Sequence, residues 1–213
     1  MKRKSNNRKG GLTLVEMIGV IAVTSILAAV LVPKVIHAVS RSKVSGTALV
    51  YNTLRTAATD YYSRSNSFPA RAGTGAANTA TRTGRFDADL LAAGLLDKLV
   101  STPIGSTETA GALTTRVHVR SLTAVQSPRV NLTATVGGNN YDLDSNNATA
   151  DFTADQMVVS LMIPGVTLSD AIQLNSIIDN AQNSGTGADR IGRCIYSPAA
   201  GGTVTVYLYL AHQ

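Results

Sequence analysis

Three oxygen-bearing side chains alternate in the segment YDLDSNNATAD, a spacing that suits a metal ion. Asp142, Asp144 and Asn146 match the first three ligand positions of a calcium-binding loop, and hard oxygen ligands are those that calcium prefers. The rest of such a loop is missing, because Asn147 stands in place of the turn glycine and Thr153 in place of the bidentate glutamate. The segment is therefore either a calcium candidate or a solvated Asp/Asn turn, and we expect no other cofactor.

A second chemically distinctive residue is Glu16, which is the only ionisable side chain between Leu12 and Val32. As a helix this stretch would be roughly 30 Å long, which is the thickness of the hydrocarbon core of a bilayer. An ionisable group inside a membrane segment is costly and usually functional. The sequence therefore predicts a membrane-spanning helix in which Glu16 has a specific role.

The other reactive side chains lack the spacing of a catalytic site. His37, His118 and His212 are far apart in the sequence and do not follow the pattern of zinc ligands. No serine lies in a GxSxG elbow, and the GTG segments at 73–75 and 185–187 are not phosphate-binding loops. Cys194 is the single cysteine, so no disulfide can form within the chain. We therefore predict that the protein is not an enzyme.

A cut between Gly11 and Leu12 would provide a cationic partner for Glu16. The new amine of Leu12 would be mostly protonated near neutral pH, and an opposite charge makes an ionised carboxylate less costly in apolar surroundings. Leu12 and Glu16 are four residues apart, so the pair could close within one chain. Alternatively, the carboxylate of one subunit meets the amine of the next and sets the register of an assembly.

Positive charge is concentrated at the amino terminus, although the net charge of +6 belongs to the whole chain. Five basic residues precede the apolar stretch: Lys2, Arg3, Lys4, Arg8 and Lys9. This distribution favours an amino end in the cytoplasm and export of everything after the helix. The remaining chain carries 14 basic and 13 acidic side chains, which argues against nucleic acid as a partner.

A second basic group follows the apolar stretch: Lys34, His37, Arg41 and Lys43. It is typical of the wet flank of a membrane helix. An ordinary secretory signal fits the segment poorly, because its apolar region is about 7 to 15 residues long and ends at a small-residue cleavage site. Here Ala28 and Ala29 are followed by more apolar sequence, VLV.

The residues KGG, the following LTLVEM and the long apolar helix resemble the start of type IV prepilins and of type II secretion pseudopilins. In that family a membrane prepilin peptidase cuts after the glycine, the new terminal residue is N-methylated, and the fifth mature residue is a glutamate needed for assembly. The resemblance implies that Gly11 precedes the cut, that Leu12 is the methylated terminus and that Glu16 is the assembly glutamate. Pro33 falls where many members have a helix-bending proline, whereas Leu12 departs from the commonest phenylalanine.

The sequence after Pro33 predicts an α+β fold. Apolar residues from Val44 to Tyr61 follow helical spacing, so the apolar helix continues as an amphipathic one to about Tyr62. Alternation predicts strands at 116–125, 129–136, 157–163, 192–196 and 203–210, with the last two forming a hairpin. Shorter helices are predicted at 87–100 and 167–180, the second capped by Ser169. The resemblance implies that the antiparallel sheet packs on the carboxyl half of the long helix, as in pilins.

These patterns divide the chain into five parts. They are a basic leader at 1–11, a transmembrane or filament-core helix at 12–33, its amphipathic half at 34–62, a variable loop with a short helix at 63–115, and a sheet domain with an inserted helix at 116–213.

We therefore expect a structural subunit of a type IV pilus-like filament or of a type II secretion pseudopilus. The resemblance implies a single-pass prepilin in the inner membrane, with its amino terminus in the cytoplasm. It also implies a prepilin peptidase, an assembly platform, and copies of itself or related pilins as partners in a periplasmic or cell-surface filament. The lack of a disulfide-closed loop favours the pseudopilin-like branch. The alternative is a membrane-anchored extracytoplasmic binding module that does not polymerise.

Overall fold

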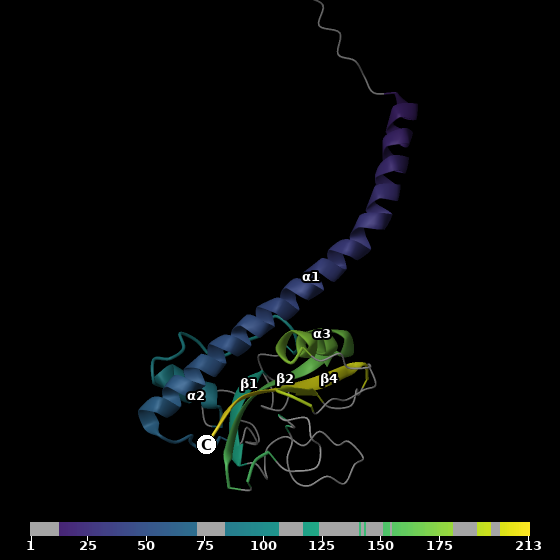
Figure 1. Cartoon of the computed structure of the whole chain (residues 1–213). Helices are drawn as coiled ribbons and strands as arrows, with labels where there is room; N and C mark the ends of the chain where they lie inside the picture. The colour runs from purple at the N-terminus through teal and green to yellow at the C-terminus, as the bar shows by residue number, and fades with distance from the viewer. Residues whose placement is uncertain are drawn as a thin grey trace, which may run out of the picture. The chain divides into compact units, whose positions relative to one another are not determined.

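The chain forms two compact units, Met1–Ser40 and Arg41–Gln213. The computed structural model describes residues 13–71, 84–106, 117–123, 141, 143, 151–153, 155–180, 191–196 and 201–213. Helix α1, Leu14–Ser65, begins in the first unit and ends in the second (Figure 1). The predicted long amino-terminal helix is therefore confirmed.

In the first unit, the described part of α1 is exposed up to Val39. All residues from Thr13 to Val39 are exposed, including large aliphatic side chains such as Ile21, Ile26 and Leu31. Among the described residues, α1 is the one helix that is long and apolar enough to cross a membrane. Such a surface is stable only in lipid or against other apolar surfaces.

In the second unit, α1 becomes amphipathic and packs on a sheet. Its buried residues are Val44, Thr47, Ala48, Tyr51, Leu54, Ala57 and Ala58, which confirms the predicted stripe and adds two positions to it. They share one core with inward-facing residues of the sheet such as Val159, Leu161 and Leu208. The carboxyl half of the long helix is therefore held by hydrophobic burial against the sheet.

Among the described residues the sheet is antiparallel and has four strands, in the order β1-β2-β4-β3. The strands are β1 (His118–Thr123), β2 (Met157–Thr167), β3 (Cys194–Tyr196) and β4 (Thr203–His212). Strands β3 and β4 pair antiparallel, with Cys194 opposite Leu208, as predicted for the closing hairpin. The predicted strand at 129–136 lies outside the described residues.

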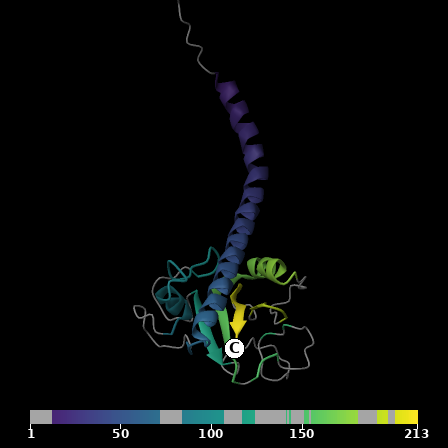
Figure 2. The same cartoon turned by 60° about the vertical axis from the view of Figure 1, so that its left-hand side comes forward.

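The described part of this unit also contains two short helices, α2 (Phe86–Ala92) and α3 (Leu168–Ile178). They lie on either side of the carboxyl half of α1, and both views show this arrangement (Figures 1 and 2). Phe86 and Leu90 of α2 and Leu174 of α3 enter the same core as α1. The three helices therefore cover one face of the sheet, while Tyr141, Phe152, Val158, Ile195 and Tyr209 form a second cluster of buried residues.

The structure corrects three expectations about element boundaries. Helix α2 ends at Ala92 rather than at the predicted Val100. The reason is a helix-ending turn, in which Gly94 adopts a positive φ of 71° and the Leu95 N–H donates to the Leu90 carbonyl. Strand β2 extends beyond the predicted Ile163 to Thr167. The N-cap of α3 is Thr167 rather than Ser169, since its side chain accepts a hydrogen bond from the Asp170 N–H.

Candidate functional site

Glu16 lies in the first turn of α1 and is bonded to the residue that precedes the helix. The Thr13 N–H donates to Glu16 Oε2 at 2.8 Å, and the Thr13 hydroxyl donates to the same oxygen at 2.9 Å. In return, the Glu16 N–H donates to Thr13 Oγ1 at 3.3 Å. This reciprocal arrangement is a capping box, which satisfies backbone donors that a helix end leaves open.

The capping box gives Glu16 a local role that is independent of any neighbouring subunit. Its sequence signature is a Thr followed three residues later by a Glu just before an apolar run, and the segment TLVE carries it. Thr13 is therefore a residue of the site that our sequence reasoning missed although the signal was present. Both hydrogen bonds to the carboxylate end on Oε2, so among the described residues Oε1 has no donor and remains open to a cation.

Pro33 lies inside α1 and does not end it. It has no N–H, so the Ala29 carbonyl four residues earlier loses its usual helical donor. The structure thus places Pro33 where a bend would be introduced, while the bend itself stays a prediction. Gly11, Leu12 and the calcium candidates Asp142, Asp144 and Asn146 lie outside the described residues.

The polar side chains within the apolar part of α1 are satisfied by their own helix. The Thr24 hydroxyl donates to the Val20 carbonyl at 2.9 Å, and the Ser25 hydroxyl donates to the Ile21 carbonyl at 2.7 Å. Such back-bonding allows hydroxyl side chains to remain in a helix surrounded by hydrocarbon. Between Glu16 and Lys34, therefore, the helix presents an essentially apolar surface.

The second unit has the features of a packed core. Among the described residues, no three His, Cys, Asp or Glu side chains are grouped to hold a metal ion. Cys194 is fully buried in β3. Burial raises the pKa of Tyr51 and Tyr207, and it raises the pKa of Tyr209 to about 12. These phenols are therefore neutral at physiological pH and serve as packing groups.

Comparison with known proteins supports the reading of the amino terminus. Residues 6–32 match a family model described as the prokaryotic N-terminal methylation motif. This motif is the signature of type IV prepilin- and pseudopilin-type proteins. The match contains Gly11, Leu12, Thr13 and Glu16, so the resemblance seen in the sequence is confirmed for this segment. No curated protein and no solved structure matches the chain.

The motif opens a long amino-terminal helix whose carboxyl half packs on an antiparallel sheet, an α+β architecture that is similar to that of pilins. Its apolar amino-terminal helix fits anchoring in a membrane. The motif also implies processing by prepilin peptidase.

Proposed function

We propose that the protein is a structural subunit of a type IV pilus-like filament or a type II secretion pseudopilus. It is made as a single-pass prepilin of the inner membrane, with its amino terminus in the cytoplasm. Prepilin peptidase cuts it between Gly11 and Leu12, Leu12 is N-methylated, and an assembly platform incorporates it into a filament. One observation carries this proposal: the methylation motif at residues 6–32 opens a helix whose side chains from Leu14 to Val39 are all exposed.

The exposed helix explains why such a subunit polymerises. Each buried square ångström of apolar surface contributes about 25 cal/mol, and the large apolar side chains of α1 between Leu14 and Val39 are exposed. In the membrane these side chains contact lipid. In a filament the same helices contact one another, so the apolar surface stays away from water during the transfer.

Glu16 then sets the register between neighbours. A carboxylate surrounded by apolar helices is costly unless it is paired. The open Oε1 can accept the charged amine of Leu12 from an adjacent subunit, while Oε2 keeps its bonds to Thr13. The helix cap and the contact between subunits are thus compatible.

The processing step is tested by the intact mass and amino-terminal sequence of protein extracted from native membranes. We expect a chain that starts at Leu12 and is one methyl group heavier than the unmodified sequence. The control is a variant in which Gly11 is replaced by alanine or by a larger residue, and this variant should retain the leader. A native protein that still carries residues 1–11 would contradict the proposal.

The destination of the filament is tested separately. If sheared surface filaments contain the chain, the subunit belongs to a pilus; if the chain stays with the cell envelope, it belongs to a pseudopilus. The lack of a disulfide within the chain supports the second outcome.

A further inference from the structure

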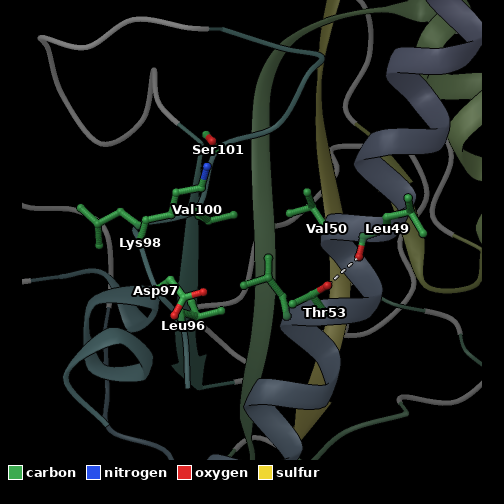
Figure 3. A pocket seen from close by; sticks show the side chains of 10 residues that line it. Leu49, Val50, Thr53, Leu96, Asp97, Lys98, Val100 and Ser101 are labelled. Atoms are coloured by element: carbon green, nitrogen blue, oxygen red, sulfur yellow. Dashed lines mark hydrogen bonds between the residues drawn. The ribbon is translucent and has the colours of Figure 1, made fainter. Parts of the chain in front are cut away.

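A groove in the second unit lies between α1 and the segment that follows α2. Leu49, Val50 and Leu54 of α1 line one side, and Leu96 and Val100 line the other. Figure 3 shows that Leu49, Val50 and Thr53 come from the helix, and that Val100 and Leu96 come from the opposite wall. The groove has a volume of about 300 Å³ and its lining is largely aliphatic. We call it the α1–α2 groove.

The α1–α2 groove is held open by contacts that do not depend on an occupant. The Val100 N–H donates to Asp87 Oδ2 at 3.1 Å, and Asp87 is itself completely buried. Gly46 of α1 lies close to Pro103, since a Cβ atom at this position would be 3.3 Å from Pro103 Cγ. The segment that forms the wall opposite α1 is therefore held in place by contacts with both helices, with α2 through Asp87 and with α1 through Pro103.

One apolar side chain at this groove is largely exposed. Leu49 is 69% exposed, although its neighbours Val44 and Ala48 are buried in the core. Exposed leucines occur singly on many proteins, but this one borders a preformed apolar groove. A partner with aliphatic side chains would cover Leu49 and fill the groove together.

We propose that the α1–α2 groove binds helix α1 of a second copy of this chain, with Lys34 of that copy next to Asp97. This inference rests on the proposed function, because it assigns the surface on which neighbouring subunits meet. The occupant is present on every copy: α1 exposes aliphatic side chains from Leu14 to Val39 that no described residue covers. Val30, Leu31, His37 and Ala38 flank Lys34 at spacings of three or four residues, so they share its face of the helix, which is mainly apolar.

The carboxylate of Asp97 at the rim fits a basic side chain of this occupant. From Met17 to Thr59 every side chain of α1 that carries a formal charge is basic, and Lys34 is the first of them. Asp97 and Lys98 lie at the groove and are exposed, and neither takes part in an ion pair with a described residue. Asp97 can therefore accept the Lys34 ammonium of the second copy while the aliphatic side chains beside Lys34 enter the groove.

The test is Leu49→Lys in the full chain, with Ile177→Lys as the matched control. Ile177 is also an exposed aliphatic residue of a helix, at 52%, but it lies on α3 and not at the groove. Both variants should be folded and processed, because neither side chain is buried. We expect the yield of filaments on electron microscopy grids to fall about tenfold or more for Leu49→Lys, as for a central interface residue, and to stay near the wild-type yield for Ile177→Lys.

A cross-link tests the position of the second copy. In a chain carrying both Asp97→Cys and Lys34→Cys, assembled filaments treated with a bis-maleimide reagent should form cross-linked ladders on a denaturing gel. Such a reagent is needed because an extended Asp–Lys ion pair separates its Cα atoms by more than about 7 Å, which is the most that a disulfide tolerates. Each single variant is the control and should give no ladder. The groove assignment would be overturned if Leu49→Lys gave the wild-type yield of filaments, or if the double cysteine variant formed normal filaments without a ladder. Either result would leave the filament proposal standing. A processed wild-type chain that never forms filaments would overturn both.

Discussion

At the scale of single residues, Glu16 combines two roles that one substitution can separate. Its carboxylate caps the helix through Thr13, and in the proposed filament its charge meets the Leu12 amine of a neighbour. Glutamine can also serve as the acceptor of a capping box, but it carries no charge. Glu16→Gln therefore keeps the cap and removes the ion pair.

We expect Glu16→Gln to be processed but not assembled, because charge pairing in apolar surroundings cannot be replaced by a neutral amide. Intact mass reports the processing, and the amount of chain in the filament fraction reports the assembly. Glu16→Ala is the companion variant, which loses both cap and charge and should also fail to assemble. Normal assembly of Glu16→Gln would show that Glu16 acts only as a helix cap.

At the scale of elements, Asp87 joins α2, β1 and one wall of the α1–α2 groove. Its carboxylate accepts hydrogen bonds from Arg85 Nε and Nη2 at 3.1 and 2.6 Å. It also accepts the Val119 N–H of β1 at 3.2 Å and the Val100 N–H at 3.1 Å. The Asp87 side chain is 0% exposed and that of Arg85 is 10% exposed, so water cannot replace the lost partners.

Asp87→Ala should lower the free energy of unfolding by about 3 kcal/mol or more, because the buried Arg85 guanidinium loses its carboxylate partner and two amides, that of Val119 (buried) and that of Val100 (part-buried), lose their acceptor. The measurement is denaturant unfolding of the full chain in detergent, followed by circular dichroism. Asp60→Ala is the control. Asp60 also pairs with an arginine, Arg64, but both side chains are largely exposed, so the change in stability should be small. Equal losses from the two variants would contradict the role of burial.

At the scale of the whole molecule, buried phenols make the folded unit sensitive to alkaline pH. Burial raises the pKa of Tyr51, Tyr141 and Tyr207, and it raises that of Tyr209 from 10.0 to about 12. Since the folded-state pKa is the higher one, the unfolded chain releases these protons first. The corresponding stability is complete below pH 10 and is lost as the pH rises toward about 12 for Tyr209.

The unfolding midpoint of the full chain in detergent should therefore fall between pH 10 and pH 12, and the fall should be smaller for Tyr209→Phe. Absorbance of ionised tyrosine gives an independent measurement, because the buried phenols should titrate later than the exposed ones. A midpoint that does not change over this pH range, or an identical fall in Tyr209→Phe, would contradict this account.

The features of this protein that could be predicted from its sequence are the local ones. The apolar stretch, the position of Glu16 within it and the stripe from Val44 to Ala58 could be read from the sequence, because helical periodicity is a local pattern. The capping box could also have been read from TLVE. Each of these features depends on residues within one or two helical turns.

The end of strand β2 could not be predicted from local sequence patterns. Pro164 and Gly165 look like a turn, yet the strand continues to Thr167 across a register shift between Ile163 and Val166. The Pro164 carbonyl accepts the Ser106 N–H at 2.7 Å, and a bulge in a sheet tolerates a proline. Because the strand now ends at Thr167, that residue rather than Ser169 caps α3.

By itself, the sequence determined the amino-terminal helix, its embedded carboxylate, its processing motif and the α+β class, since charge and periodicity along neighbouring residues suffice for these. Only the tertiary structure decided where α2 stops, how far β2 runs, and that Asp87 anchors Val100 opposite Val50 to form a groove. The reason is that these features depend on segments far apart in the chain. Their backbone donors and apolar surfaces find partners only once the sheet and helices have packed.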